Sequence, residues 1–127
     1  MTGVQTCALP ISVGLWPSEG SVSDHALAIA ADCGFTWAAS DNGVLARTLS
    51  RDASPEISYR PYVWQQGGRE MRMLFRDHYL SDLIGFEYSR MNPHDAAGHF
   101  LDRIRHNAGG RDCVVPIILD GENAWEW

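Results

Sequence analysis

Apolar and polar positions along the chain follow two spacings, which predict strands followed by helices. Short apolar runs at 13–16, 35–39 and 113–119 are typical of strands, and the branched side chains of the last run are typical of a strand covered on both faces. After the first run, apolar residues at helical spacing predict an amphipathic helix that is capped by Ser21 and ends at Gly34. A shorter helix is expected after the second run. This βαβα alternation favours a parallel sheet.

The middle of the chain predicts a hairpin and two more helices. Residues 59–64 face residues 71–75 across a turn that contains two glycines. Apolar positions from Leu80 to Tyr88 then follow helical spacing. A further helix opens at 92–93, where asparagine is the cap and proline the first helical residue, and it ends at the glycines of 109–110.

The last apolar run leads directly into acidic residues. Pro116 has no N–H for a sheet ladder, so regular pairing is expected to begin at Ile117 and to continue to Leu119. Asp120 and Glu122 follow at once. Side chains just past the end of a parallel strand point into a shared mouth, so both carboxylates are expected there.

The first residues differ in character from everything that follows them. Residues 1–11 carry no charged side chain and no helical or alternating period, and they resemble the translation of a sequencing adapter, with Ser12 as the junction. A truncated signal peptide is the rival interpretation, but the basic start and the apolar core of about 7 to 15 residues are missing. We therefore expect 1–12 to be non-native and 13–127 to be a fragment of one domain of a longer protein.

Charge and cysteine content narrow the choice of partners. The net charge of -6 argues against a nucleic-acid phosphate backbone, and an acidic mouth suits neutral or cationic ligands. Cys33 and Cys113 are too few and too scattered for a disulfide framework or a zinc site, which favours a reducing, cytoplasmic location. No apolar run approaches the length of a membrane span, so no membrane partner is expected.

The candidate chemistry lies where the expected strands end. Each of the four strands is followed by an acid, and right-handed crossovers would bring these acids to one rim: Glu19, Asp41, Asp77 and Asp120. Two of the four could instead be helix caps. Tryptophans and a histidine collect at the same rim: Trp16, Trp37, Trp125 and His78. Indole faces pack against sugar rings while acids bind hydroxyls, so the mixture is typical of a carbohydrate site.

Four segments together resemble glycoside hydrolase family 57, most nearly its amylopullulanase-like and α-amylase-like branch. They are Gly-Leu-Trp-Pro-Ser-Glu-Gly at 14–20, Leu-Phe-Arg-Asp-His at 74–78, Leu-Ser-Asp-Leu-Ile-Gly-Phe at 80–86 and Leu-Asp-Gly-Glu-Asn at 119–123. The resemblance implies an α/β fold, a partial (β/α)7 TIM-like barrel of about four βα units with an inserted hairpin. It also implies action on α-glucans such as starch or glycogen.

The resemblance implies roles for individual residues as well. Glu19 would be the nucleophile and Asp120 the general acid/base of a retaining double displacement, which places two such groups about 5 to 5.5 Å apart and requires no metal or other cofactor. The residues expected to bind the sugar are Trp16, Trp37, Asp41, Arg76, Asp77, His78, Glu122 and Trp125.

Two other functions remain open from the residues. A metal-dependent glycan deacetylase would need an Asp with two His, but His94 and His99 are five apart and do not share a helix face, and His78 with Asp82 is only a pair. A non-catalytic α-glucan-binding protein would use the same tryptophans and acids for binding alone.

Overall fold

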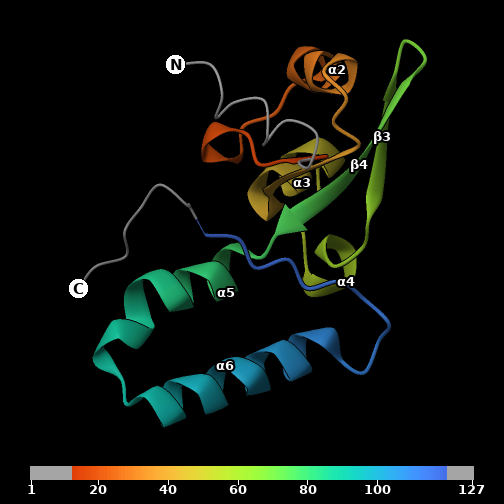
Figure 1. Cartoon of the computed structure of the whole chain (residues 1–127). Helices are drawn as coiled ribbons and strands as arrows, with labels where there is room; N and C mark the ends of the chain where they lie inside the picture. The colour runs from red at the N-terminus through yellow and green to blue at the C-terminus, as the bar shows by residue number, and fades with distance from the viewer. Residues whose placement is uncertain (1–12, 120–127) are drawn as a thin grey trace, which may run out of the picture. The chain divides into compact units, whose positions relative to one another are not determined.

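The computed structural model describes residues 13–119 (Figure 1). These residues form two compact units. Of the described residues, the first unit takes in 13–40 and Pro61–Leu74, and the second takes in Asp41–Arg60 and 75–119. Chain positions 1–12 and 120–127, which include Asp120, Glu122 and Trp125, lie outside the described residues. The two units are described separately below.

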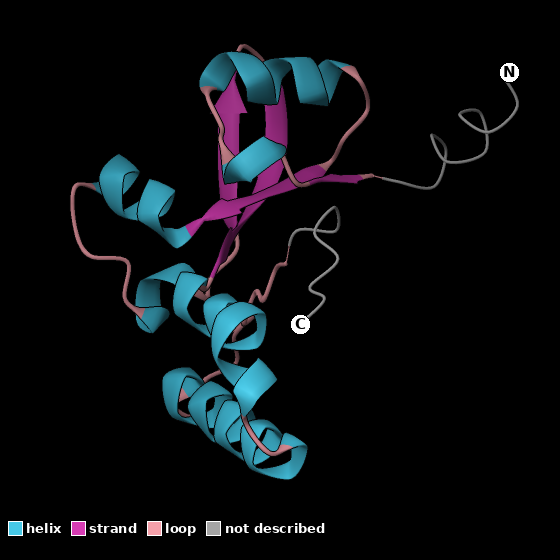
Figure 2. Ribbon diagram, turned by 90° about the vertical axis from the view of Figure 1, so that its left-hand side faces the viewer, coloured by secondary structure: helices cyan, strands magenta, loops and turns pink. Residues whose placement is uncertain are grey.

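The first unit is built on a four-stranded mixed sheet (Figure 2). Its order is β1-β2-β4-β3, and the strands are β1 (Gly14–Leu15), β2 (Trp37–Asp41), β4 (Arg69–Arg76) and β3 (Tyr62–Gln66). β1 pairs with β2 in parallel, as the βαβ pattern predicted, and β3 pairs with β4 as an antiparallel hairpin. The last residues of β2 and β4 already belong to the second unit. The mixed α/β class is thereby confirmed, whereas these residues do not form a closed barrel.

The hairpin prediction is confirmed, and its turn explains the two glycines. Gly67 and Gly68 both have positive φ, 57° and 78°, which a two-residue turn of the primed type requires at both central positions. The pairing of Tyr62 with Met73 and of Gln66 with Arg69 follows from that turn. Met71 and Met73 alternate with exposed residues and are buried in the core.

Helix α2 (Asp24–Asp32) lies against the hairpin (Figure 2). Its cap is Ser23, whose Oγ accepts the Ala26 N–H at 3.2 Å, so the predicted cap at Ser21 was wrong by two residues. Asp24 instead accepts the indole N–H of Trp64, a residue of β3, at 2.8 Å. At the other end the Asp32 carboxylate accepts hydrogen bonds from Arg69 Nε–H at 2.7 Å and from Arg69 Nη2–H at 2.8 Å. These hydrogen bonds attach α2 to the hairpin at both ends of the helix.

The second unit is mainly helical. It contains α3 (Asn42–Leu49), α4 (Pro55–Ser58), α5 (His78–Asp82), a π-helical turn η2 (Leu83–Glu87), a 3-10 turn η3 (Tyr88–Arg90) and α6 (Pro93–Ala108). The predicted start of α6 is confirmed, because Asn92 accepts the His94 N–H at 2.9 Å. Gly109, with a φ of 59°, ends it as predicted. α6 contacts both α4 and α5.

The predicted fourth strand was wrong for the residues that are described. Within 113–119 the chain forms neither strand nor helix. Pro116 has no N–H, and the N–H of Ile118 donates to the side-chain Oγ of Ser81 at 3.3 Å instead of to a backbone carbonyl. The segment is therefore held by scattered bonds in place of a sheet ladder.

Candidate functional site

Glu19 lies in a tight 3-10 turn (Ser18–Gly20) that follows β1. Its φ of 55° and ψ of 21° are left-handed, which is uncommon for a residue with a β-carbon and costs on the order of 1–2 kcal/mol. The turn is held by the Gly20 N–H bonding to Pro17 O at 2.9 Å and by the buried Ser40 hydroxyl donating to Gly20 O at 2.6 Å. The Glu19 residue itself is exposed. Strained residues of this kind cluster at functional sites, and this one carries an accessible carboxylate.

Two tryptophans, Trp16 and Trp37, belong to the first unit, as this turn does. Trp16 is half-buried, and Trp37 keeps 39% of its surface exposed at the start of β2. The Trp37 ring lies across β1 so closely that a β-carbon at Gly14 would overlap it. The glycine of the Gly-Leu-Trp-Pro-Ser-Glu motif thus leaves the space that this indole occupies beside the strand.

Three of the predicted site residues meet in the second unit: Asp41, Arg76 and His78. Asp41 Oδ2 accepts the Arg76 Nε–H and Nη2–H at 3.0 and 2.8 Å and lies 3.0 Å from His78 Nδ1. The other ring nitrogen of His78 lies 3.0 Å from Asp82 Oδ2, one helical turn further on. Sequence reasoning left Asp82 out of the sugar-binding set. Its spacing of four residues from His78 is the signal that could have found it.

The charges of this group stabilise the ionised form of Asp41. Burial raises the pKa of Asp41, but hydrogen bonds from His78, from the Gly43 N–H and from Arg76 outweigh burial and leave the pKa below its ordinary value. The carboxylate also caps α3, since its Oδ1 accepts the Gly43 N–H at 2.8 Å. Asp41 is therefore a fixed anion at neutral pH, while the more exposed ring of His78 remains accessible to a ligand.

Asp77, by contrast, faces the interior. Its residue is 6% exposed, its Oδ1 accepts the Leu80 N–H at 2.8 Å as the cap of α5, and its Oδ2 accepts the Tyr59 hydroxyl at 2.5 Å. That hydroxyl also accepts from Asn107 Nδ2 at 3.1 Å. Sequence reasoning missed Tyr59 and Asn107, because neither follows the carboxyl end of an expected strand or belongs to a motif.

The buried pair of Tyr59 and Asp77 predicts an alkaline limit to stability. Burial and the neighbouring carboxylate raise the pKa of the Tyr59 phenol well above its ordinary value of 10.0. Since the folded chain holds this proton more tightly than the unfolded chain, its contribution is complete below about pH 10 and is lost as the pH rises through the folded pKa. Urea midpoints measured from pH 8 to 11.5 should fall more steeply for the wild type than for Tyr59→Phe. Parallel curves would contradict this assignment.

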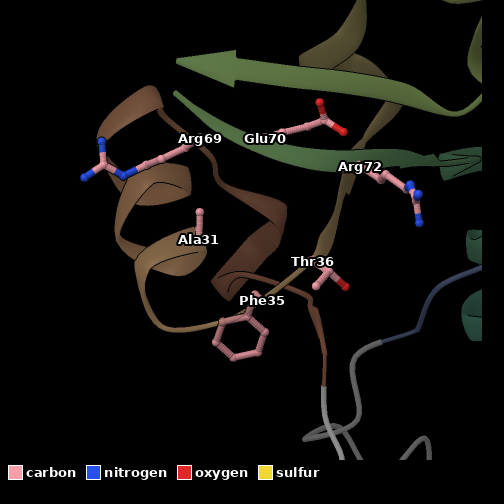
Figure 3. A pocket seen from close by; sticks show the side chains of 6 residues that line it. All are labelled: Ala31, Phe35, Thr36, Arg69, Glu70 and Arg72. Carbon is pink, nitrogen blue, oxygen red and sulfur yellow. The ribbon is translucent and has the colours of Figure 1, made fainter. Parts of the chain in front are cut away.

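The first unit also carries an open hollow of about 380 Å³ away from these residues (Figure 3). It adjoins Phe35 and Thr36, which precede β2, so it lies at the opposite end of that strand from Asp41. None of the predicted site residues lines it. Within residues 13–119, no three His, Cys, Asp or Glu side chains are arranged to hold a metal ion. Among the described helices, none has the length and apolar character of a membrane span.

Comparison with known proteins identifies the family. A search of curated proteins found no significant match. A family model described as "Glycosyl hydrolase family 57" matches residues 11–127, which takes in the Glu19 turn, the group of Asp41, Arg76 and His78, and the positions that follow the last apolar run. Because this match covers nearly the whole sequence, the chain belongs to glycosyl hydrolase family 57.

Proposed function

We propose that this chain carries the catalytic carboxylates of a retaining glycosidase that acts on α-glucans such as starch or glycogen. In this proposal Glu19 attacks the anomeric carbon, and Asp120 first protonates the leaving oxygen and then activates water. Family membership implies a glycoside hydrolase. The observation that most supports the role of Glu19 is its exposed carboxylate on a strained turn directly after β1.

The sugar-binding roles follow from the chemistry of the neighbouring side chains. The exposed surface of Trp37 offers an apolar face to a pyranose ring, and Trp16, which follows β1, offers a second indole. Asp41, Arg76 and His78 offer fixed acceptors and donors for hydroxyl groups. We assign Asp77 to holding the start of α5, because both of its carboxylate oxygens have partners inside the second unit. Glu122 and Trp125 complete the proposed binding set.

The proposed architecture is part of a (β/α)7 barrel. β1, β2 and β4 are neighbours in the sheet, and each is followed by residues of the proposed site: Glu19 after β1, Asp41 at the end of β2, and Arg76 with His78 at the end of β4. In barrels of this kind the catalytic groups come from the ends of several strands.

A reaction followed by proton NMR tests the proposal. With soluble maltooligosaccharides, we expect the α-anomer of the new reducing end to appear first, because two displacements restore the configuration. Chelation with EDTA should leave the rate unchanged, since neither carboxylate role calls for a metal. Zinc-dependent release of acetate from an acetylated glycan, without cleavage of maltooligosaccharides, would favour a metal-dependent deacetylase. Binding without turnover would indicate a carbohydrate-binding protein.

A further inference from the structure

The second unit carries an open hollow of about 400 Å³, which we call the tyrosine hollow. Six residues line it: Tyr79, Leu83, Glu87, Tyr88, Met91 and His99. None of the six belongs to the proposed catalytic or sugar-binding set. Tyr79 follows His78 directly in α5, but successive residues of a helix lie about 100° apart and so face different sides. The lining of the tyrosine hollow is therefore separate from the group of Asp41, Arg76 and His78.

The chain changes its helical period along this lining. Tyr79 and Leu83 are four residues apart, which is the spacing of one face of an α-helix. Leu83 and Tyr88 are five apart through η2, and these are the hydrogen-bonding spacing and the extent of a π-helical turn. Tyr88 and Met91 are three apart through η3, the repeat of a 3-10 turn. The irregular turns thus keep one row of side chains on the hollow, and π-helical turns are frequent at functional sites.

The two tyrosine rings of the hollow have fixed neighbours. The Tyr88 hydroxyl oxygen lies 2.8 Å from His99 Nδ1, and the Tyr88 ring packs edge-on against the rings of His99 and Phe100, with centroids 5.9 Å apart in each pair. The guanidinium carbon of Arg103 lies 5.8 Å from the centroid of the Tyr79 ring. Tyr79 still keeps 51% of its surface exposed. A ligand can therefore contact these rings at little cost in side-chain entropy.

The chemistry of the lining favours a neutral ligand that carries hydroxyl groups. Glu87 is an acid, and none of the six lining residues is a lysine or an arginine, which disfavours an anionic ligand. A cation over Tyr79 would meet the charge of Arg103 beside the same ring, which disfavours a cationic ligand. Aromatic rings next to a carboxylate and an imidazole suit a sugar, because its C–H faces pack on the rings while its hydroxyls bond to the polar groups.

We infer that the tyrosine hollow is a second carbohydrate-binding site, which binds glucosyl units of an α-glucan chain apart from the catalytic groups. The choice of an α-glucan rests on the proposed function, whereas a carbohydrate ligand agrees with the family. A polymer can occupy two sites of one protein at once, so binding at the second site raises the effective concentration of the chain at the first. A short oligosaccharide cannot reach both sites and gains nothing.

A titration with maltoheptaose tests the site directly. The full chain carrying Glu19→Gln prevents turnover, and the backbone amide signals are followed by NMR. We expect the signals of Glu87, Tyr88 and Met91 to shift in a saturable way, because these residues line the hollow. Choline, a cationic probe, should leave the same signals unchanged. Absence of shifts at these three residues with maltoheptaose, or shifts with choline in its place, would overturn the inference.

Substitution of Tyr79 tests the contribution of the stacking ring. Tyr79→Ala should weaken maltoheptaose binding at the hollow about two- to tenfold, because one aromatic contact is lost. Tyr79→Phe keeps the ring and should bind as the wild type does. Phe86→Ala is the matched control, since Phe86 is a 56% exposed aromatic residue of η2 that does not line the hollow. Equal weakening by Tyr79→Ala and Phe86→Ala would overturn the inference. A change of Tyr79→Ala from dimer to monomer in size-exclusion chromatography would do so too, because the surface would then join two copies of the chain.

Kinetics on a long and a short substrate separate this inference from the proposed function. On soluble starch, Tyr79→Ala should raise KM about two- to tenfold and keep kcat, because the reacting groups are unchanged. On p-nitrophenyl α-maltotrioside both constants should stay within about twofold of the wild type, because this substrate cannot span two sites. Equal rises of KM on both substrates would overturn the inference. If maltoheptaose binds at the hollow but no α-glucan is cleaved, the proposed function is wrong and the inference stands. If α-glucans are cleaved and the hollow shows no binding, the inference is wrong and the proposed function stands.

Discussion

Replacing Glu19 with glutamine should lower the turnover of soluble α-glucans by about four orders of magnitude or more. Loss of a nucleophile that acts as one unit with its acid/base partner has effects of this size. Glutamine has nearly the same shape, so it should keep the Ser18–Gly20 turn and its bond from Ser40 to Gly20. The amide cannot form the glycosyl ester, and the chemical step is therefore lost while substrate binding remains. Initial rates of reducing-end release measure this effect.

A control at another glutamate makes the result specific to Glu19. Glu70→Gln changes an exposed glutamate of the same unit, on β4, and should retain wild-type turnover. Asp120→Asn should fall nearly as far as Glu19→Gln, because the leaving oxygen would then depart unprotonated. Turnover of Glu19→Gln near that of the wild type would remove the nucleophile assignment, whatever the family.

Replacing Asp77 with alanine should destabilise the fold by about 2–4 kcal/mol. The change removes the cap of α5, worth about 0.5–2 kcal/mol, and leaves the buried Tyr59 hydroxyl without its acceptor, worth about 1–3 kcal/mol. Such a loss is a large part of the about 5–15 kcal/mol that holds a domain folded. Urea denaturation followed by circular dichroism measures it as a lower midpoint.

Asp102→Ala is the matched control for this prediction. Asp102 is an exposed aspartate of α6 that pairs with Arg105 at 3.1 Å, and surface pairs contribute about 0–1 kcal/mol. If Asp77 instead bound sugar hydroxyls, as its motif suggested, Asp77→Ala would lose activity and keep its urea midpoint. An unchanged midpoint would therefore contradict the buried role and return Asp77 to the binding set.

The sequence by itself determined the features that depend on neighbours along the chain. The hairpin and its glycine turn, the Asn92 cap and the Gly109 end of α6 follow from short-range backbone preferences, and each is confirmed. The family also followed from short motifs and is confirmed by the match over residues 11–127. Such signals are readable because a cap, a turn or a motif is complete within a few residues.

Only the tertiary structure decided which partner each polar group has. Asp41 and Asp77 look alike in the sequence, since each follows a strand and caps a helix. Asp41 bonds to Arg76 and His78 and so belongs to a charged group. Asp77 is buried and accepts the hydroxyl of Tyr59, which is 18 positions earlier in the chain. The segment 113–119 has the apolar composition of a strand, yet Pro116 has no N–H for a ladder and the Ile118 N–H donates to the Ser81 side chain. Apolar periodicity indicates which side of a helix or strand is buried. A hydrogen bond needs a donor and an acceptor, and residues far apart in the sequence meet only in the folded chain.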